Sequence, residues 1–168
     1  MDGCIFCKIV SGEIPSLKIY ETDKCIAVLD INPANPGHIL IISKKHFENI
    51  YDIDDDVLED MILVAKKMSI RLKKRFECLG VNILMNNEKI AGQMISHAHI
   101  HVIPRYEDDK VIITYAKKEI TKEQFKEIAK KMSEDDTKDS EEIIEKEKSK
   151  DNKKSTKKEN IKDEWVFR

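Results

Sequence analysis

Three histidines, His97, His99 and His101, alternate with apolar residues near the middle of the chain. A neutral imidazole carries a lone pair, so it can attack phosphorus and form a covalent link between enzyme and phosphate. With an ordinary pKa near 6.5, about three quarters of free histidine is neutral at pH 7. Flanking imidazoles can donate hydrogen bonds to the phosphate oxygens. The row therefore predicts phosphate chemistry, and its alternative is three surface histidines on an edge strand.

The elements that must position this row can be read from the same pattern. Alternation has the two-residue period of a β-strand, so the histidines would share one face, about 7 Å apart. Ala98, Ile100 and Val102 would then face a core. Apolar runs between turn-rich segments predict further strands at 18–21, 25–30, 38–42 and 81–86, and residues 111–115 are a candidate for one more.

Helical spacing occurs in two segments. Apolar residues recur at three- and four-residue steps over 54–76, with acids at its start and basic residues at its end, which predicts a long helix. Thr121 and Gln124 form a capping-box pattern before an apolar stripe, which predicts a short helix over 122–132. The fold class is therefore α+β, with a mainly antiparallel sheet of about five strands, one long helix and one short helix.

Charge and composition limit the function classes. Of 168 residues 37% are charged, yet the net charge is only −2, so nothing indicates binding to nucleic acid or to an anionic membrane. No apolar run could span a bilayer and no secretory leader is evident, so a cytoplasmic location is expected. In such a compartment the four cysteines are expected to be thiols or metal ligands.

The C-terminal third differs in composition from the rest. We expect a domain over 1–116 and an extension over 117–168, which contains the short helix, a charged segment at 133–160 and an aromatic end at 161–168. The charged segment is too poor in apolar residues to fold alone, so it is a solvated linker or a partner-binding segment. Trp165 in the aromatic end is expected to dock on this chain's own domain or on a second subunit.

Several motifs in order resemble the histidine triad family of nucleotide hydrolases and transferases. The most specific is the row of three histidines, preceded by Gly92 and Gln93. Similar segments elsewhere are the opening Ile5-Phe6 and Lys8-Ile9, Asp30 at a strand end, the run 36–41 with 44–46 after it, and Pro104-Arg105. The resemblance covers roughly residues 4–106.

The resemblance implies a reaction and roles for single residues. His99 would be the nucleophile that becomes nucleotidylated, and His101 would support the phosphate. Asn86 would lie near the phosphate or ribose, and Gln93 would contact the substrate from its loop. His38 would make a hydrogen bond behind the row, with an ordinary core histidine as the alternative. A homodimer with sheets joined across a two-fold axis is also implied.

A nucleotide pocket follows from the same resemblance. Asp30 could accept hydrogen bonds from both ribose hydroxyls, which favours a purine ribonucleotide. Apolar residues at positions similar to the base pocket could instead be ordinary core residues: Ile5, Phe6, Ile9, Val28, Leu29 and Ile31. The loop before the row would complete the site with Gly92, Gln93 and Met94. Met94 departs from the family, because several members carry a hydroxyl residue there.

A second group of residues could bind metal. Cys4, Cys7, His46 and His97 form a Cys₂His₂ set that suits a tetrahedral, closed and therefore structural zinc site. Many bacterial members of the family look like this. The site would pin the N-terminal segment to the histidine strand, so that His97 orients the row. The alternative is a pair of buried thiols with a hydrogen-bonded His97.

The leading function is hydrolysis of a nucleoside 5′-phosphoramidate, or of a related nucleotidyl conjugate, through a nucleotidyl-His99 intermediate. A dinucleoside polyphosphate hydrolase would use the same nucleophile. A protein of another class, which binds nucleotide and zinc for interaction and turns over slowly, is the third possibility. The sequence does not separate adenine from guanine as the preferred base.

Overall fold

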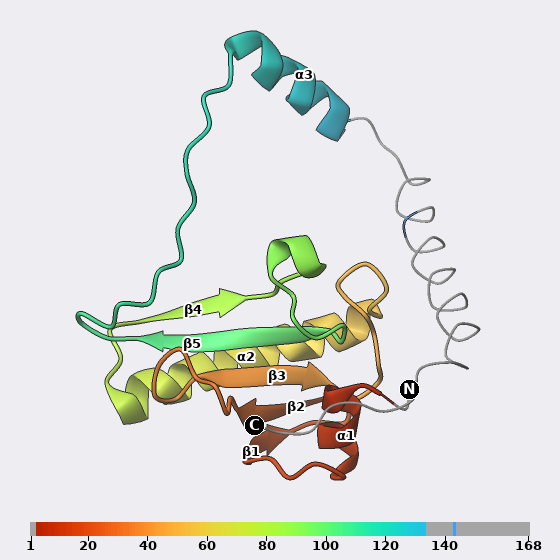
Figure 1. The fold of residues 1–168 in the computed structure, drawn as a ribbon, viewed down its shortest axis with the longest axis vertical. Helices are drawn as coiled ribbons and strands as arrows, with labels where there is room; N and C mark the ends of the chain where they lie inside the picture. Colours follow the sequence, from red (N-terminus) through yellow and green to blue (C-terminus); the bar gives the residue numbers. More distant parts are fainter. Residues whose placement is uncertain (1–2, 134–142, 144–168) are drawn as a thin grey trace, which may run out of the picture. The chain divides into compact units, whose positions relative to one another are not determined.

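The computed structural model describes residues 3–133 and Ile143. Five strands form one antiparallel sheet in the order β1-β2-β3-β5-β4 (Figure 1). The strands are β1 (Lys18–Glu21), β2 (Cys25–Leu29), β3 (Ile39–Ser43), β4 (Gly80–Leu84) and β5 (His99–Arg105). The helices are α1 (Ile5–Ser11), α2 (Asp55–Phe76), α3 (Lys122–Ser133) and the single 3₁₀ turn η1 (Lys89–Ala91). The predicted α+β class is confirmed.

The chain divides into two compact units. The first, Met1–Thr114, contains the sheet with α1 and α2, and the second, Tyr115–Arg168, contains α3. The capping box at α3 is present, since Thr121 N–H donates to Gln124 Oε1 at 2.8 Å and Gln124 N–H donates to Thr121 Oγ1 at 3.2 Å. Of the expected charged segment only Ser133 and Ile143 are described, and the aromatic end with Trp165 lies outside the described residues.

The sheet has two apolar faces, and α2 covers one of them. Ile41 on β3, Ile100 and Val102 on β5 pack with Met61 and Met68 of α2 in the larger core. On the opposite face Leu40 and Ile42 pack with other residues around α1 in a smaller cluster. Because strand residues alternate between faces, this packing leaves His99 and His101 on the α1 side. The predicted inward direction of Ala98, Ile100 and Val102 is confirmed.

Replacing Ile41 with alanine should destabilise the protein by about 2–5 kcal/mol, because this fully buried side chain lies in the larger core. Ile41→Val removes a single methylene and should cost only about 0.5–1.5 kcal/mol. Urea unfolding of both variants measures the difference. Equal stability of Ile41→Ala and wild type would contradict the packing described.

The structure adds one element to those predicted and differs from two local expectations. The added element is helix α1, whose seven residues are too few to show a helical period; Gly12, whose φ of 82° suits glycine, caps its end. Strand β5 begins at His99, so His97 lies in the bend before it. Residues 111–115 form no strand with any described part of the chain. The turn before them contains two positive-φ residues, Asp108 and Lys110, which redirect the chain.

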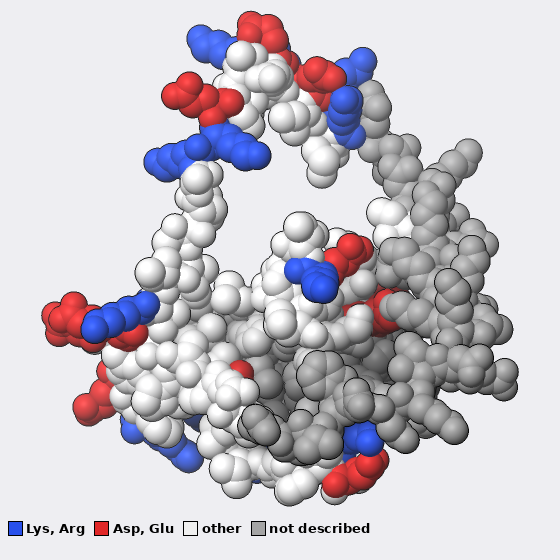
Figure 2. Space-filling view, in the orientation of Figure 1, with Lys and Arg blue, Asp and Glu red and all other residues white. Residues whose placement is uncertain are grey.

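The surface shows no concentration of one charge sign in the view drawn. Lys and Arg side chains lie interspersed with Asp and Glu over the coloured atoms (Figure 2). None of the described helices is both long and apolar enough to cross a membrane. The expectation that the protein does not bind nucleic acid stays a prediction.

Candidate active site and metal centre

The second histidine of the row, His99, is held with one ring nitrogen toward the main chain. Its Nδ1 lies 2.7 Å from the carbonyl oxygen of His97. A carbonyl can only accept, so Nδ1 carries the hydrogen and Nε2 keeps its lone pair. The Phe6 ring stands edge-on, with the two ring centroids 5.0 Å apart. Burial lowers the pKa of His99, so the ring stays neutral at pH 7. A neutral ring in this tautomer has a lone pair on Nε2, and such a lone pair is able to attack an electrophile.

The third histidine, His101, is oriented by a chain of hydrogen bonds. Ala34 N–H donates to His38 Nδ1 at 3.1 Å, which leaves the hydrogen of a neutral His38 on Nε2. That Nε2 donates to His101 Nδ1 at 3.1 Å, so His101 holds its own hydrogen on Nε2. Burial lowers the pKa of His101 to about 4 and also lowers that of His38. His101 thus offers an N–H donor beside the lone pair of His99.

The pairing of β3 with β5 determines where His99 and His101 lie. His99 pairs with Ile42 and His101 with Leu40 across β3 and β5. The strand register therefore puts the two rings next to each other, with centroids 4.9 Å apart. Gly37, at φ 92°, turns the chain just before His38, and a Cβ there would lie 3.1 Å from Leu72 Cδ2. A side chain at this position would be strained, so glycine is required to bring His38 against His101.

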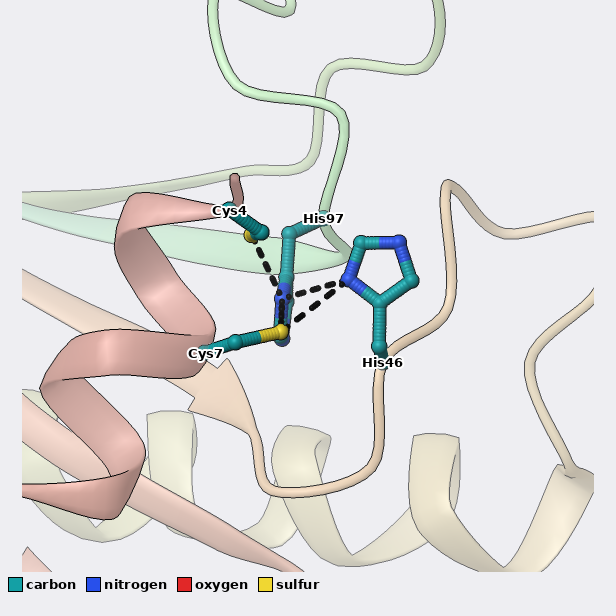
Figure 3. A group of neighbouring side chains, drawn as sticks. All are labelled: Cys4, Cys7, His46 and His97. Carbon is teal, nitrogen blue, oxygen red and sulfur yellow. Dashed lines mark hydrogen bonds between the residues drawn. The ribbon is translucent and has the colours of Figure 1, made fainter. Parts of the chain in front are cut away.

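Four predicted metal ligands converge. Cys4 and Cys7 lie at the start of α1, His46 in the loop after β3 and His97 in the bend before β5, and their side chains point toward one another (Figure 3). The ligand atoms all lie within 4.8 Å of one another. His97 Nδ1 lies 3.4 Å from Cys4 Sγ, 3.5 Å from Cys7 Sγ and 3.1 Å from His46 Nδ1.

These separations fit a tetrahedral metal ion. Zinc bonds of about 2.0–2.3 Å place neighbouring ligand atoms roughly 3.3–3.8 Å apart. His97 Nε2 donates to the Ser43 carbonyl oxygen at 2.8 Å, which leaves the Nδ1 lone pair for the metal. Such a bond from the second ring nitrogen is typical of a ligating histidine. The donor set therefore matches zinc, which supplies a closed structural cross-link when bound.

A second group could be mistaken for a metal site. One ligand atom from each of Asp30, His38 and His101 lies within 4.8 Å of the others. His38 Nδ1 already accepts from Ala34 N–H, so the atom facing His101 carries a hydrogen and has no free lone pair. Binding a metal there would break this backbone bond. We therefore interpret the group as a hydrogen-bond chain beside a carboxylate.

The loop before the row is held by its own side chains. The buried Gln93 amide donates to Glu48 O at 2.6 Å and accepts from Glu88 N at 2.7 Å. Both amide atoms are thus used to tie loop to loop. Asn86 Nδ2 lies 3.4 Å from the Gly92 carbonyl oxygen. Met94 is 85% exposed. A substrate contact by Gln93 stays a prediction, and the structure gives its amide a positioning role.

The residues predicted to line the nucleotide pocket lie in different places in the structure. Phe6 and Val28 are buried in the smaller cluster, and Ile9 packs against them. Leu29 packs on the α2 side of the sheet, because it alternates with Val28 along β2. The structure leaves two others open to solvent: Ile5 at 41% exposed and Ile31 at 85%. Asp30 Oδ2 lies 3.4 Å from His38 Nδ1, at the same end of the site as His101.

These features can be compared with known proteins. A model of the HIT domain matches residues 11–108, more than half of the chain. The chain belongs to the HIT family. An adenosine 5′-monophosphoramidase of Candida albicans in this family is 44% identical over 110 residues, which cover 63% of this chain and 72% of that protein.

Solved HIT structures share the fold. A HIT family protein of Bacillus subtilis superposes with a TM-score of 0.73 and 36% identity, covering 78% of this chain and 95% of that one. A zinc-bound histidine triad family protein of Mycobacterium smegmatis gives a TM-score of 0.64 and 33% identity, covering 70% and 85%. The resemblance to the HIT family read from the sequence is confirmed.

Just beyond β5 of this HIT domain, Asp109 joins two loops. Its carboxylate binds Arg105 through both oxygens, at 2.7 and 2.8 Å, and accepts from Asn35 Nδ2 at 2.8 Å. Asn35 lies in the loop that also contains Ala34 and so holds the donor to His38 in place. The Arg105 guanidinium lowers the pKa of Asp109 far below its usual range.

Asp109→Asn should lower the melting temperature by several degrees at pH 7, since it removes one side of this ion pair. A depressed carboxyl pKa gives stability that is present above pH 4 and is lost as the pH falls below it. The wild type should therefore approach the variant in melting temperature toward pH 2. Calorimetry between pH 7 and 2 measures this, and a constant difference across that range would contradict it.

Some functional atoms could not be found from residue types. Ser43 contributes a main-chain carbonyl to His97, and Ala34 contributes an N–H to His38. Backbone groups occur at every residue, so only the fold shows which of them face the histidines. The position of His38 does indicate a role beside the row, because this residue precedes the strand next to it. Its bond to His101 supports the first of the two interpretations given above.

Proposed function

We propose that this HIT protein hydrolyses nucleoside 5′-phosphoramidates or related nucleotidyl conjugates through a nucleotidyl-His99 intermediate. The observation that carries the proposal is the fixed tautomer of His99, whose Nδ1–H donates to His97 O at 2.7 Å. Relatives that bear the name adenosine 5′-monophosphoramidase support the choice of reaction. A purine ribonucleotide is the substrate class we favour, with Asp30 accepting from the ribose hydroxyls.

The chemistry proceeds in two displacements. His99 Nε2 forms a bond to the α-phosphorus, and the bond from phosphorus to the leaving amine breaks, with the amine taking up a proton. His101 Nε2–H donates to a phosphate oxygen and so stabilises the negative charge that develops there. Water then forms a new P–O bond, the P–N bond to His99 breaks, and nucleoside monophosphate leaves with neutral His99 restored.

The deciding experiment is a side-by-side assay of adenosine 5′-phosphoramidate and diadenosine tetraphosphate. We expect faster turnover of the phosphoramidate. Preferential turnover of the dinucleotide would instead make the protein a dinucleoside polyphosphate hydrolase with the same nucleophile. Turnover of both that is far slower than nucleotide dissociation would favour the third possibility, an interaction protein that binds nucleotide and zinc.

Met94 tests the leaving-group side of this proposal. A thioether cannot donate a hydrogen bond, whereas a serine hydroxyl at this position could assist an amine leaving group. Met94→Ser should therefore raise kcat on a phosphoramidate about tenfold or more, within the range of proton-transfer assistance. The side chain is 85% exposed, so the fold should tolerate the change. An unchanged kcat would show that the missing donor does not limit the reaction.

We also propose a structural zinc ion in the Cys4–Cys7–His46–His97 cluster and assign the chain to the zinc-containing bacterial type of the family. The donor atoms and their separations support this, as does the zinc-bound relative.

A homodimer is proposed on different grounds. β4 is an edge strand of the sheet, and its Ile83 is 45% exposed. On α2, Ile62 is 48% exposed and Ile70 is 47% exposed. Sedimentation of the full chain tests it, and a monomer at all concentrations would contradict it.

A further inference from the structure

The loop that precedes His38 is anchored by one buried side chain. It joins β2 to β3, and within 31–36 Asn35 alone is buried, at 8% exposed. The side-chain amide of Asn35 donates one hydrogen to Pro104 O at 2.9 Å and the other to Asp109 Oδ2 at 2.8 Å. The first acceptor lies in β5 and the second just beyond it. Asn35 therefore ties this loop to the strand that carries the histidine row.

Two further contacts hold the loop on either side of Ala34. Asn32 N–H bonds at 2.8 Å to a side chain two residues earlier, which leaves this bond within the loop itself. Tyr106 OH donates to Pro36 O at 3.0 Å, at an exposed position. An exposed group that loses its partner can bond to water instead, whereas a buried one bears the full cost of desolvation. Asn35 is therefore the contact that determines where Ala34 lies against the domain.

The position of Ala34 matters because His38 Nδ1 has two possible partners. Ala34 N–H donates to this nitrogen at 3.1 Å, whereas Asp30 Oδ2, 3.4 Å from it, can only accept when ionised. With Ala34 as the partner, neutral His38 carries its hydrogen on Nε2 and donates to His101 Nδ1 at 3.1 Å. With Asp30 as the partner, the hydrogen of His38 would lie on Nδ1. The bond to His101 would then reverse, and His101 would have no hydrogen on Nε2.

We propose that Asn35 is a positioning residue, which fixes the loop so that the His38–His101 pair keeps a hydrogen on Nε2 of the second ring. The proposal rests on the proposed function, in which this N–H donates to the phosphate. Without the amide of Asn35, the loop moves away from β5 and the carboxylate of Asp30 becomes the partner of His38 Nδ1. Each ring keeps one hydrogen in this reversal, so the site changes its donor without changing its charge.

The size of the effect follows from the donor that is lost. Complete loss of one hydrogen-bond donor to charge that develops in a transition state costs about 10²–10³-fold in kcat. Partial reversal of the pair lowers kcat by the same factor as the population of the donor form, and we expect about tenfold or more for Asn35→Ala. The loss should fall mainly on kcat, because the donor acts on the transition state. A residue that only stabilises the fold would leave kcat and the hydrogen positions of folded protein unchanged.

The test uses the full chain labelled with ¹⁵N-histidine, in which long-range ¹H–¹⁵N spectra show which ring nitrogen carries the hydrogen. Burial lowers the pKa of His38 and His101, so both rings are neutral at pH 7 and their tautomers can be read there. Wild type is compared with Asn35→Ala and with Ala34→Pro, which removes the N–H itself. Tyr106→Phe is the matched control, because it removes the other side-chain contact to the loop and leaves Asn35 in place. Turnover of adenosine 5′-phosphoramidate is measured on the same samples.

We expect the hydrogen of His101 on Nε2 in wild type and Tyr106→Phe, and on Nδ1 in a measurable fraction of Asn35→Ala and Ala34→Pro, with kcat lowered by the matching factor. Folded Asn35→Ala with the hydrogen positions of wild type would overturn the proposal. If this variant does not fold, Ala34→Pro decides in the same way. Wild type with the hydrogen of His101 on Nδ1 would overturn the proposal by itself. The expected positions without any turnover in wild type would instead contradict the proposed function, since the positions are measured without substrate.

Discussion

His99→Ala should lower kcat/KM for adenosine 5′-phosphoramidate by about 10⁴-fold or more, the scale seen when a nucleophile is removed from an enzyme. The expected loss is large because no other ring in the site has the same arrangement. His101 carries its hydrogen on the nitrogen beside the substrate, so it has no lone pair there with which to replace His99. His97 is turned away toward the metal ligands.

Controls separate this loss from misfolding. The variant should bind AMP within about tenfold of wild type by calorimetry, because His101 and Asp30 remain. Lys67→Ala, on α2 at the opposite face of the sheet, should leave the rate unchanged. A His99→Ala protein that keeps more than about one tenth of the wild-type rate would remove His99 as the nucleophile.

Cys7→Ser should have the largest effect on stability. Burial raises the pKa of Cys7 to about 11, so without metal this thiol is protonated at pH 7 and carries no charge that could attract its neighbours. A bound zinc ion holds cysteine as the thiolate and adds its binding free energy to folding. Loss of a metal site belongs to the few changes that cost more than about 4 kcal/mol.

The loss of the metal site in Cys7→Ser is measured by the zinc content and by the free energy of unfolding. Wild type should hold about one zinc per chain, and Cys7→Ser should hold close to none and unfold at much lower urea. Cys78→Ala is the matched control, since Cys78 is buried in the larger core and away from the cluster. Carefully purified wild type that is free of zinc and as stable as a zinc-supplemented sample would contradict the structural role.

Much of the fold was readable because its signals are local. The alternation in the histidine row gave both faces of β5, and the three- and four-residue spacing gave α2 almost to the residue. The short α1 lacked enough residues for a period, and only Gly12 at its end marked it. The alternation continues through the bend that contains His97, so the sequence predicts a strand there although the structure has none.

The site was readable in its residue types and less so in its geometry. The cysteines and histidines of the metal cluster come from three distant segments, and the sequence could suggest the set but not the convergence of its ligand atoms. The tautomers of His99 and His101 depend on His97 O and Ala34 N–H, which are backbone groups brought in by the fold. Leu29 gives a second example. Leucine occurs both in ligand pockets and in cores, so its residue type alone does not say which of the two it lines.

The central claim is the covalent intermediate, and acid quenching of single-turnover reactions tests it most directly. Enzyme in excess over adenosine 5′-phosphoramidate is denatured on the millisecond-to-second scale, and peptides are mapped by mass spectrometry under conditions that preserve P–N bonds. The account predicts an adenylylated peptide with the group on His99, which forms before AMP appears and decays as AMP is released. An adduct on another residue, or AMP release with no adduct at any time, would contradict it.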